Sequence, residues 1–172
     1  MTSGKSTIGP ILANSLGWDY YDLDREIEFV AGKTVVKIFE TEGENFFREL
    51  ETKKLNELSL KKNLIIALGG GTITNKNNFA IIKSTGKLVY LKTAPEVIYK
   101  RIKHKLDRPL FIDLVLDEKP EEAFLERIKK ILAERNHLYE SADITIDTDK
   151  QRIGLTIDSL VKKISRMLNE EN

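Results

Sequence analysis

The start of the chain has the residue types of a phosphate-binding loop. Ser3, Gly4, Lys5, Ser6 and Thr7 match the second half of the pattern G-x-x-x-x-G-K-[ST], and a run with helical spacing follows them. A glycine turn presents bare backbone N–H groups, and the helix behind it adds the positive end of its dipole. Lys5 would then reach the outer phosphates of a nucleotide, and the Ser6 hydroxyl would hold Mg²⁺. The same residues also suit a plain helix start, with Ser6 as its cap.

Further candidates follow predicted strands. Asp22 ends the strand predicted at 18–22, and Gly69–Gly71 follow the apolar run 64–68. Open α/β sheets bind ligands at the carboxyl ends of their strands, so we expect these residues to share one site with the phosphate loop. Asp22 and Asp24 also suit an ordinary turn. Consecutive glycines are costly in chain entropy, which either a tight turn or a close approach to a ligand would explain.

Arginines supply the positive charge that an anionic ligand needs. Arg135 continues the apolar stripe of the helix predicted from 120 to 135, so it should point inward, where its charge needs a partner. A ligand carboxylate or phosphate would serve. Arg48, in the predicted helix 44–62, and Arg108, in the aperiodic stretch 107–119, also suit ordinary solvated positions.

Composition narrows the class of protein. The chain has 172 residues, 28 basic and 27 acidic side chains, and a net charge of +1, so no strong field points to nucleic acid. It has no cysteine and no signal-peptide pattern, and the apolar run 64–68 is too short to span a bilayer. We expect a single-domain, monomeric, cytoplasmic protein. His104 and His137 lack the spacing of metal or triad chemistry and are predicted at the surface.

The order of elements predicts an open α/β sheet. Strands are predicted at 18–22, 64–68, 87–91 and 143–147, and helices at 8–16, 25–30, 34–42, 44–62, 77–84, 95–105, 120–135 and 157–168. The run 64–68 is apolar throughout, which indicates a strand buried on both faces of a parallel sheet. The segment 143–147 alternates, which is typical of an edge strand. Strands that alternate with helices form α/β folds.

In this order and spacing the motifs resemble the shikimate kinase family of small P-loop kinases. After the phosphate loop, the resemblance is carried by Asp22-Leu23-Asp24, Phe47-Arg48-Glu49-Leu50-Glu51, Gly69-Gly70-Gly71, Arg108-Pro109-Leu110 and Glu134-Arg135-Asn136-His137-Leu138-Tyr139. It implies a three-layer α/β/α P-loop kinase fold, whose parallel sheet has the strand order 2-3-1-4-5 and helices on both faces. A single domain would span 1–172, with a substrate-binding segment at about 23–62 and a lid at about 105–119.

The resemblance also implies roles on the nucleotide side. ATP as co-substrate would contact Ser3, Gly4, Lys5, Ser6, Thr7, Arg101 and Arg108. Among these, Lys5 meets the transferred phosphate, Arg108 reaches the phosphates from the lid, and Arg101 flanks the adenine. Ser6 and Asp22 organise Mg²⁺, Asp22 through water.

On the acceptor side, Asp24 would bond the attacking hydroxyl of shikimate and accept its proton. Arg48 and Arg135 would grip the carboxylate of shikimate, and planar guanidinium groups suit that geometry. The turn of Gly69, Gly70 and Gly71 would let the substrate approach the backbone. The implied catalytic residues are Lys5, Asp24 and Arg108.

Parts of the family pattern lie outside the printed sequence: the first glycine of the loop and the strand before it. We therefore expect the true start to lie upstream of Met1. That strand is central in the family's sheet, and its absence would remove on the order of 10 kcal/mol of burial free energy. Pro10 and His137 are smaller departures. Other functions stay open, namely a gluconate or nucleotide kinase, or a non-catalytic shikimate-binding module.

Overall fold

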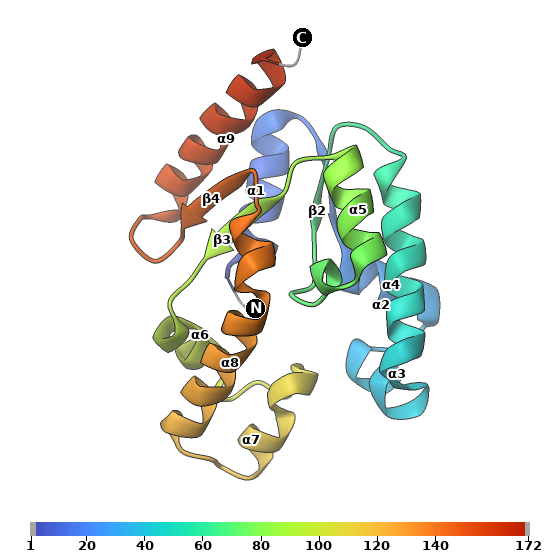
Figure 1. Cartoon of the computed structure of the whole chain (residues 1–172), viewed down its shortest axis with the longest axis vertical. Helices are drawn as coiled ribbons and strands as arrows, with labels where there is room; N and C mark the ends of the chain where they lie inside the picture. Colours follow the sequence, from blue (N-terminus) through green and yellow to red (C-terminus); the bar gives the residue numbers. More distant parts are fainter. Residues whose placement is uncertain (1–2, 171–172) are drawn as a thin grey trace.

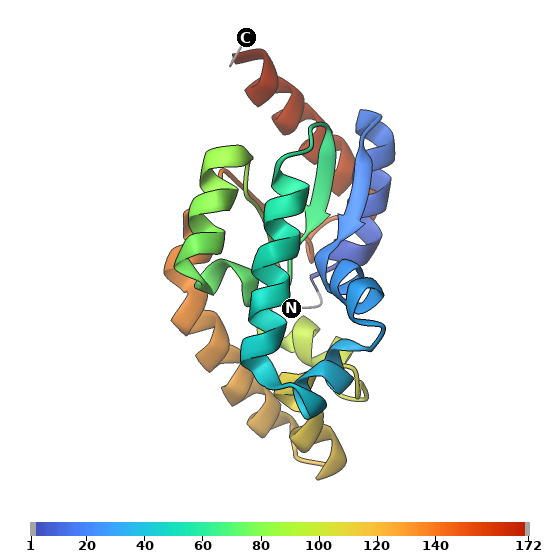
Figure 2. The same ribbon diagram turned by 90° about the vertical axis from the view of Figure 1, so that its right-hand side faces the viewer.

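Short strands form two separate parallel pairs in the computed structural model, which describes residues 3–170. β1 (Asp19–Asp22) pairs with β2 (Leu64–Ala67), and β3 (Val89–Lys92) pairs with β4 (Ile144–Asp147). Helices cover both faces of this divided sheet (Figures 1 and 2). The predicted α/β class with parallel strands is confirmed.

The helices connect the strands in the expected alternation. In chain order they are α1 (Lys5–Leu16), α2 (Leu23–Ala31), α3 (Val35–Thr41), α4 (Gly43–Ser59), α5 (Lys76–Thr85), α6 (Pro95–Ile102), α7 (Ile112–Leu116), α8 (Glu121–Glu140) and α9 (Ile153–Glu170), with 3-10 turns η1 (Thr72–Thr74) and η2 (Pro109–Phe111). Pro10 lies inside α1 without ending it. Within 3–170, no helix is both long and apolar enough to cross a membrane.

Some predicted boundaries are wrong. The stretch 107–119, predicted as a loop, contains η2 and α7. A helix of that length is too short to show an amphipathic period, and it forms because Phe111 and Leu114 pack into a cluster with α6 and α8. Gly43 was expected to end a helix, but it begins α4 with a φ of 85°. α6 ends at Ile102 rather than at 105.

Separate apolar clusters hold the two strand pairs. One lies between β1–β2 and helices α2 to α5, and includes Phe47, Leu55 and Leu58. A second joins α1 and α9 to β3–β4, through residues such as Leu12 and Leu160. β4 alternates between buried and exposed residues, which confirms an edge strand. Each strand pair is therefore held by its own apolar cluster.

An apolar slot separates the two strand pairs. Its volume is about 570 Å³, and β2 and β3 form its walls. Leu64, Ile65 and Ile66 were predicted to be buried on both faces, but they are only half-buried because the slot lies along their edge. The arrangement agrees with the implied order 2-3-1-4-5 without strand 1, since β1 and β2 match strands 2 and 3, and β3 and β4 match strands 4 and 5.

Candidate active site

The phosphate loop leads into α1 through a left-handed glycine. Gly4 has a φ of 95°, which strains any residue with a side chain, and its carbonyl accepts hydrogen bonds from Thr7 N–H at 3.0 Å and Ile8 N–H at 2.8 Å. Lys5 follows as the first residue of the helix. Burial lowers the pKa of Lys5. The negative charges of Asp24 and Asp22 oppose this shift, and the positive charge of Arg108 adds to it. The charges of Asp24, Asp22 and Arg108 therefore all lie close enough to Lys5 to shift its pKa.

The two aspartates lie at the junction of β1 and α2. Asp22 ends the strand and caps the helix, since its Oδ1 accepts a hydrogen bond from the Asp24 N–H at 3.2 Å. Burial raises the pKa of Asp24, as do the charges of Asp22 and Glu51, while Lys5 lowers it. Asp24 is thus a carboxylate with increased proton affinity beside a lysine, which suits a group that accepts a proton.

The glycine turn after β2 brings polar side chains together. A Cβ on Gly69 would lie 3.2 Å from both Asp24 Oδ1 and Thr72 Oγ1, and 3.4 Å from Glu51 Oε1. A Cβ on Gly71 would lie 2.8 Å from Arg48 Nη2. The absence of side chains at these two positions is therefore what allows the polar groups of α2 and α4 to reach the turn.

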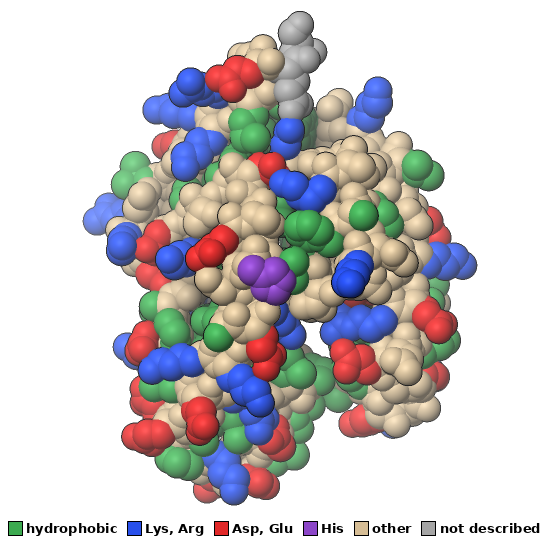
Figure 3. All heavy atoms as spheres, in the orientation of Figure 1, with side chains coloured by type: hydrophobic (Ala, Val, Ile, Leu, Met, Phe, Trp, Pro, Cys, Tyr) green, Lys and Arg blue, Asp and Glu red, His purple; other side chains and the backbone are tan. Residues whose placement is uncertain are grey.

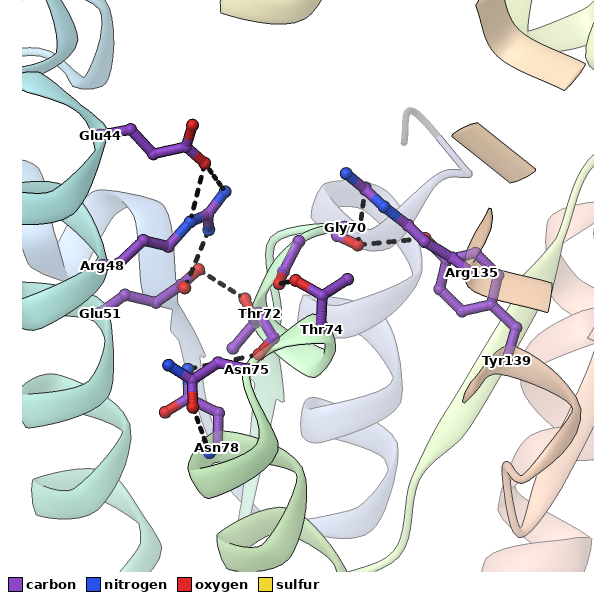
Figure 4. A network of polar contacts seen from close by, with 11 residues as sticks. Glu44, Arg48, Glu51, Gly70, Thr72, Thr74, Asn75, Asn78, Arg135 and Tyr139 are labelled. Atoms are coloured by element: carbon purple, nitrogen blue, oxygen red, sulfur yellow. Dashed lines mark hydrogen bonds and ion pairs between the residues drawn. The ribbon is translucent and has the colours of Figure 1, made fainter. Parts of the chain in front are cut away.

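Arg48 is held on both sides by carboxylates (Figure 4). Its Nη1 donates to Glu51 Oε2 at 2.9 Å, and its Nε and Nη2 donate to Glu44 Oε1 at 3.2 and 3.0 Å. Glu51 is fully buried and also accepts from Thr72 Oγ1 at 2.7 Å. Desolvation lowers the pKa of Arg48, but Glu51 and Glu44 outweigh it, so the net shift is upward. The guanidinium is fixed in place and permanently charged.

Arg135 and Tyr139 tie α8 to the glycine turn. Arg135 Nη1 and the Tyr139 hydroxyl both donate to the Gly70 carbonyl, at 2.9 and 3.1 Å (Figure 4). The Tyr139 ring stacks on Tyr90 of β3 with 4.7 Å between centroids. Arg135 was predicted to point inward; in this structure it points toward the glycine turn, and its partner is a backbone carbonyl.

The other two candidate arginines, Arg101 and Arg108, belong to α6 and to the segment that follows it. Arg108 precedes η2, its Nε is buried without a hydrogen-bond partner in the described part of the chain, and its Nη2 lies 3.7 Å from Asp107. Arg101 of α6 lies 3.9 Å from Asp149. On the face drawn in Figure 3, a hollow separates the α6–α8 lobe from the α3–α4 side, and charges of both signs are interspersed.

Oxygen donors such as the Asp22 carboxylate and the Ser6 hydroxyl suit Mg²⁺ more than a softer metal, since Mg²⁺ is usually bound through one or two carboxylates, waters and substrate phosphates. No group of three or more His, Cys, Asp or Glu side chains in residues 3–170 could hold a metal. The Asp22 carboxylate acts electrostatically on Lys5, the expected phosphate ligand.

Sequence reasoning gave no role to Glu51 and Tyr139, although both lie within the motifs, and it did not consider Thr72. Glu51 follows Arg48 by three residues, a spacing that places both side chains on one helix face, and this signal was available. Thr72 directly follows the glycines, but nothing in the sequence links it to α4. Tyr139 lies four residues after Arg135, on the same face of α8, so its approach to the turn was also open to inference.

A divided parallel sheet with helices on both faces, together with a Gly-Lys-Ser loop at a helix N-terminus, is typical of P-loop nucleotide-binding proteins. A family model described as shikimate kinase matches residues 1–168. Shikimate kinase of Chlorobaculum parvum is 46% identical, and the match covers 95% of this chain and 88% of that protein. Shikimate kinase of Prosthecochloris aestuarii is 48% identical, and the match covers 96% of this chain and 84% of that protein. The chain therefore belongs to the shikimate kinase family.

Solved structures agree with this assignment. Shikimate kinase from Acinetobacter baumannii in complex with shikimate superposes with a TM-score of 0.81 at 36% identity, covering 99% of this chain and 89% of that one. Shikimate kinase from Bacteroides thetaiotaomicron gives a TM-score of 0.80 at 30% identity, covering 98% and 94%. The fold around the site is thus shared along nearly the whole chain.

Proposed function

We propose that this chain transfers the γ-phosphate of ATP to the 3-hydroxyl of shikimate with Mg²⁺. One observation carries the proposal: Asp22 ends β1 and caps α2 beside Asp24, Asp24 borders the glycine turn at Gly69, and both carboxylates lie close enough to Lys5 to oppose the lowering of its pKa. Phosphoryl transfer needs positioning and charge neutralisation more than covalent chemistry, and this group supplies both.

Arg48 and Arg135 are the proposed ligands of the shikimate carboxylate. Glu51 and Glu44 fix the Arg48 guanidinium before substrate arrives, which lowers the ordering cost of binding. Arg135 already reaches the Gly70 carbonyl, so the carboxylate would be bound between α4 and α8, over the glycine turn. A planar fork that binds both carboxylate oxygens gives orientation as well as affinity.

Asp24 is the proposed proton acceptor. As the 3-hydroxyl oxygen forms its bond to the γ-phosphorus and the bond to the ADP oxygen breaks, the hydroxyl proton passes to Asp24. Lys5 and Arg108 offset the negative charge on the phosphoryl oxygens. Mg²⁺, when held by Ser6 and Asp22, supplies further charge neutralisation at the phosphates.

The lid segment 105–119 and Arg101 complete the proposed nucleotide site. Arg108 lies at the start of η2, so movement of this segment would carry its charge toward or away from Lys5. Closure over the phosphates would exclude water and limit ATP hydrolysis. We expect the enzyme to act as a monomer.

The test is the choice of phosphate acceptor, measured as ADP release with shikimate, gluconate or a nucleoside monophosphate. We expect release with shikimate alone, and at least tenfold weaker shikimate binding in Arg48→Lys, since lysine cannot form the bidentate contact. Transfer to gluconate or a nucleotide with shikimate inert would refute the substrate. Calorimetric binding of shikimate without any ADP release would instead indicate a non-catalytic shikimate-binding module.

A further inference from the structure

The three carbonyls of the glycine turn are bound in two different ways. The Gly69 carbonyl accepts a hydrogen bond from the Thr72 N–H at 3.2 Å. The Gly71 carbonyl accepts from Thr74, through the N–H at 3.0 Å and the hydroxyl at 2.7 Å. The donors to the Gly70 carbonyl come instead from α8, 65 and 69 residues further along the chain. The middle of the turn is therefore fixed by a distant helix.

Arg135 and Tyr139 converge on this one oxygen (Figure 4). They lie four residues apart in α8, so both side chains leave the same face of the helix. Arg135 Nη1 donates at 2.9 Å and the Tyr139 hydroxyl at 3.1 Å. A carbonyl oxygen has two lone pairs and accepts both bonds together. The two donors thus share the Gly70 carbonyl without excluding each other.

The two donors differ in what else they can bind. Arg135 carries a charged, planar fork of N–H groups that suits a carboxylate. To lie in the plane of a carboxylate, the guanidinium must turn from the orientation that its bond to Gly70 gives it. Tyr139 has a single O–H, and its ring is held by stacking on Tyr90 with 8° between the ring planes. Tyr139 is therefore the donor that stays when Arg135 moves.

We propose that Tyr139 is a positioning residue for shikimate, because it keeps the Gly70 carbonyl bound when Arg135 turns to the substrate carboxylate. This inference rests on the proposed function, in which Arg135 binds that carboxylate. Gly70 is half-buried, so leaving its carbonyl without a donor costs free energy. Tyr139 removes this cost from the binding step, and it acts through Arg135 and the turn.

The Tyr139 side chain also joins the two halves of the divided sheet. The glycine turn follows β2, whereas Tyr90 belongs to β3. Tyr139 bonds to the turn and stacks on Tyr90 with 4.7 Å between the ring centroids. The phenol is thus held at its hydroxyl and along its ring. Its O–H therefore needs no rearrangement when the substrate arrives.

The test is calorimetric binding of shikimate to the full 172-residue chain without ATP. In Tyr139→Phe the ring and its stack remain, and only the hydroxyl is lost. Arg135 is then the remaining donor to the Gly70 carbonyl, so its turn to the substrate leaves that carbonyl unbound. We expect the Kd for shikimate to rise roughly three- to tenfold, the equivalent of one hydrogen bond. The shikimate KM should rise by a similar factor, while kcat and the ATP KM stay within about twofold.

Tyr90 provides the matched controls. Tyr90→Phe keeps the ring stack and should leave the Kd for shikimate unchanged. Tyr90→Leu removes the ring that orients Tyr139 but keeps the Tyr139 hydroxyl, so it should weaken shikimate binding about two- to threefold. Because this second variant disturbs the hydroxyl from a different strand, it tests the inference even if Tyr139→Phe folds poorly.

A double-mutant cycle separates positioning from plain support of the turn. In Arg135→Ala no guanidinium leaves the Gly70 carbonyl on binding, so adding Tyr139→Phe should change the Kd for shikimate by less than about twofold. An equal effect of Tyr139→Phe in the parent and in Arg135→Ala would show that the hydroxyl only supports the turn, which would overturn the inference.

Two further results distinguish this inference from the proposed function. An unchanged Kd in Tyr139→Phe, with a parent that binds shikimate, would overturn the inference alone. If the parent itself binds no shikimate, the proposed function fails and this inference fails with it.

Discussion

The buried carboxylate of Glu51 should contribute strongly to stability and to shikimate binding. In Glu51→Gln, the buried negative charge beside Arg48 is lost, and the new amide can keep its oxygen toward Arg48 only by turning its nitrogen to the Thr72 hydroxyl. Removing one partner of a buried ion pair costs about 3–5 kcal/mol. In this variant Arg48 still pairs with Glu44, and 28% of its side chain is exposed to solvent. We therefore expect the free energy of unfolding to fall by less than that, about 2–3 kcal/mol.

Glu44→Gln is the matched control, since Glu44 pairs with the same arginine from a side chain that is 58% exposed. An exposed ion pair contributes little, so this variant should lose less than about 1 kcal/mol. Urea unfolding at pH 7 gives both values, and the slope with denaturant should stay constant. The shikimate KM of Glu51→Gln should rise at least tenfold while the ATP KM holds. Equal losses in the two variants would refute the argument from burial.

Three further changes have expected outcomes. Burial raises the pKa of Asp24, so its ionised form opposes folding above pH 3.8. In Asp24→Asn, the free energy of unfolding in urea at pH 7 should equal or exceed that of the parent, while kcat falls by roughly 10²–10⁴. A clear loss of stability would contradict this reasoning. Gly71→Ala places a Cβ 2.8 Å from Arg48 Nη2 and should raise the shikimate KM roughly ten- to hundredfold in steady-state kinetics, with the ATP KM as control. Burial alone would raise the pKa of Asp143, but Lys83 and a backbone N–H hold that pKa below 3.8. The ionised Asp143 therefore stabilises the fold above pH 3.8, and this stabilisation is lost as the pH falls through the lowered pKa. Asp143→Asn should cost about 1–2 kcal/mol in urea at pH 7 and progressively less in acid.

The lid segment shows how local pattern fails when an element is short. No period is visible in 107–119, yet Pro109 to Leu116 form turns that bury Phe111 and Leu114 against α6 and α8. A five-residue helix presents too few positions for amphipathic spacing, and its stability comes from the tertiary cluster. The last helix is the opposite case, because its stripe of Ile157, Leu160 and Ile164 repeats often enough to be predicted, and these residues are buried.

The sequence by itself determined the order of strands and helices, the phosphate loop and the expectation that strand ends meet at one site. These follow from residue spacing, since helix and strand periods are properties of the local backbone. Only the tertiary structure decided that Glu51 reaches Arg48 and Thr72 together, and that Leu64 and Ile66 border a slot. Such contacts join segments far apart in the chain. They depend on how the glycine turn, α4 and the two strand pairs pack, which local spacing does not specify.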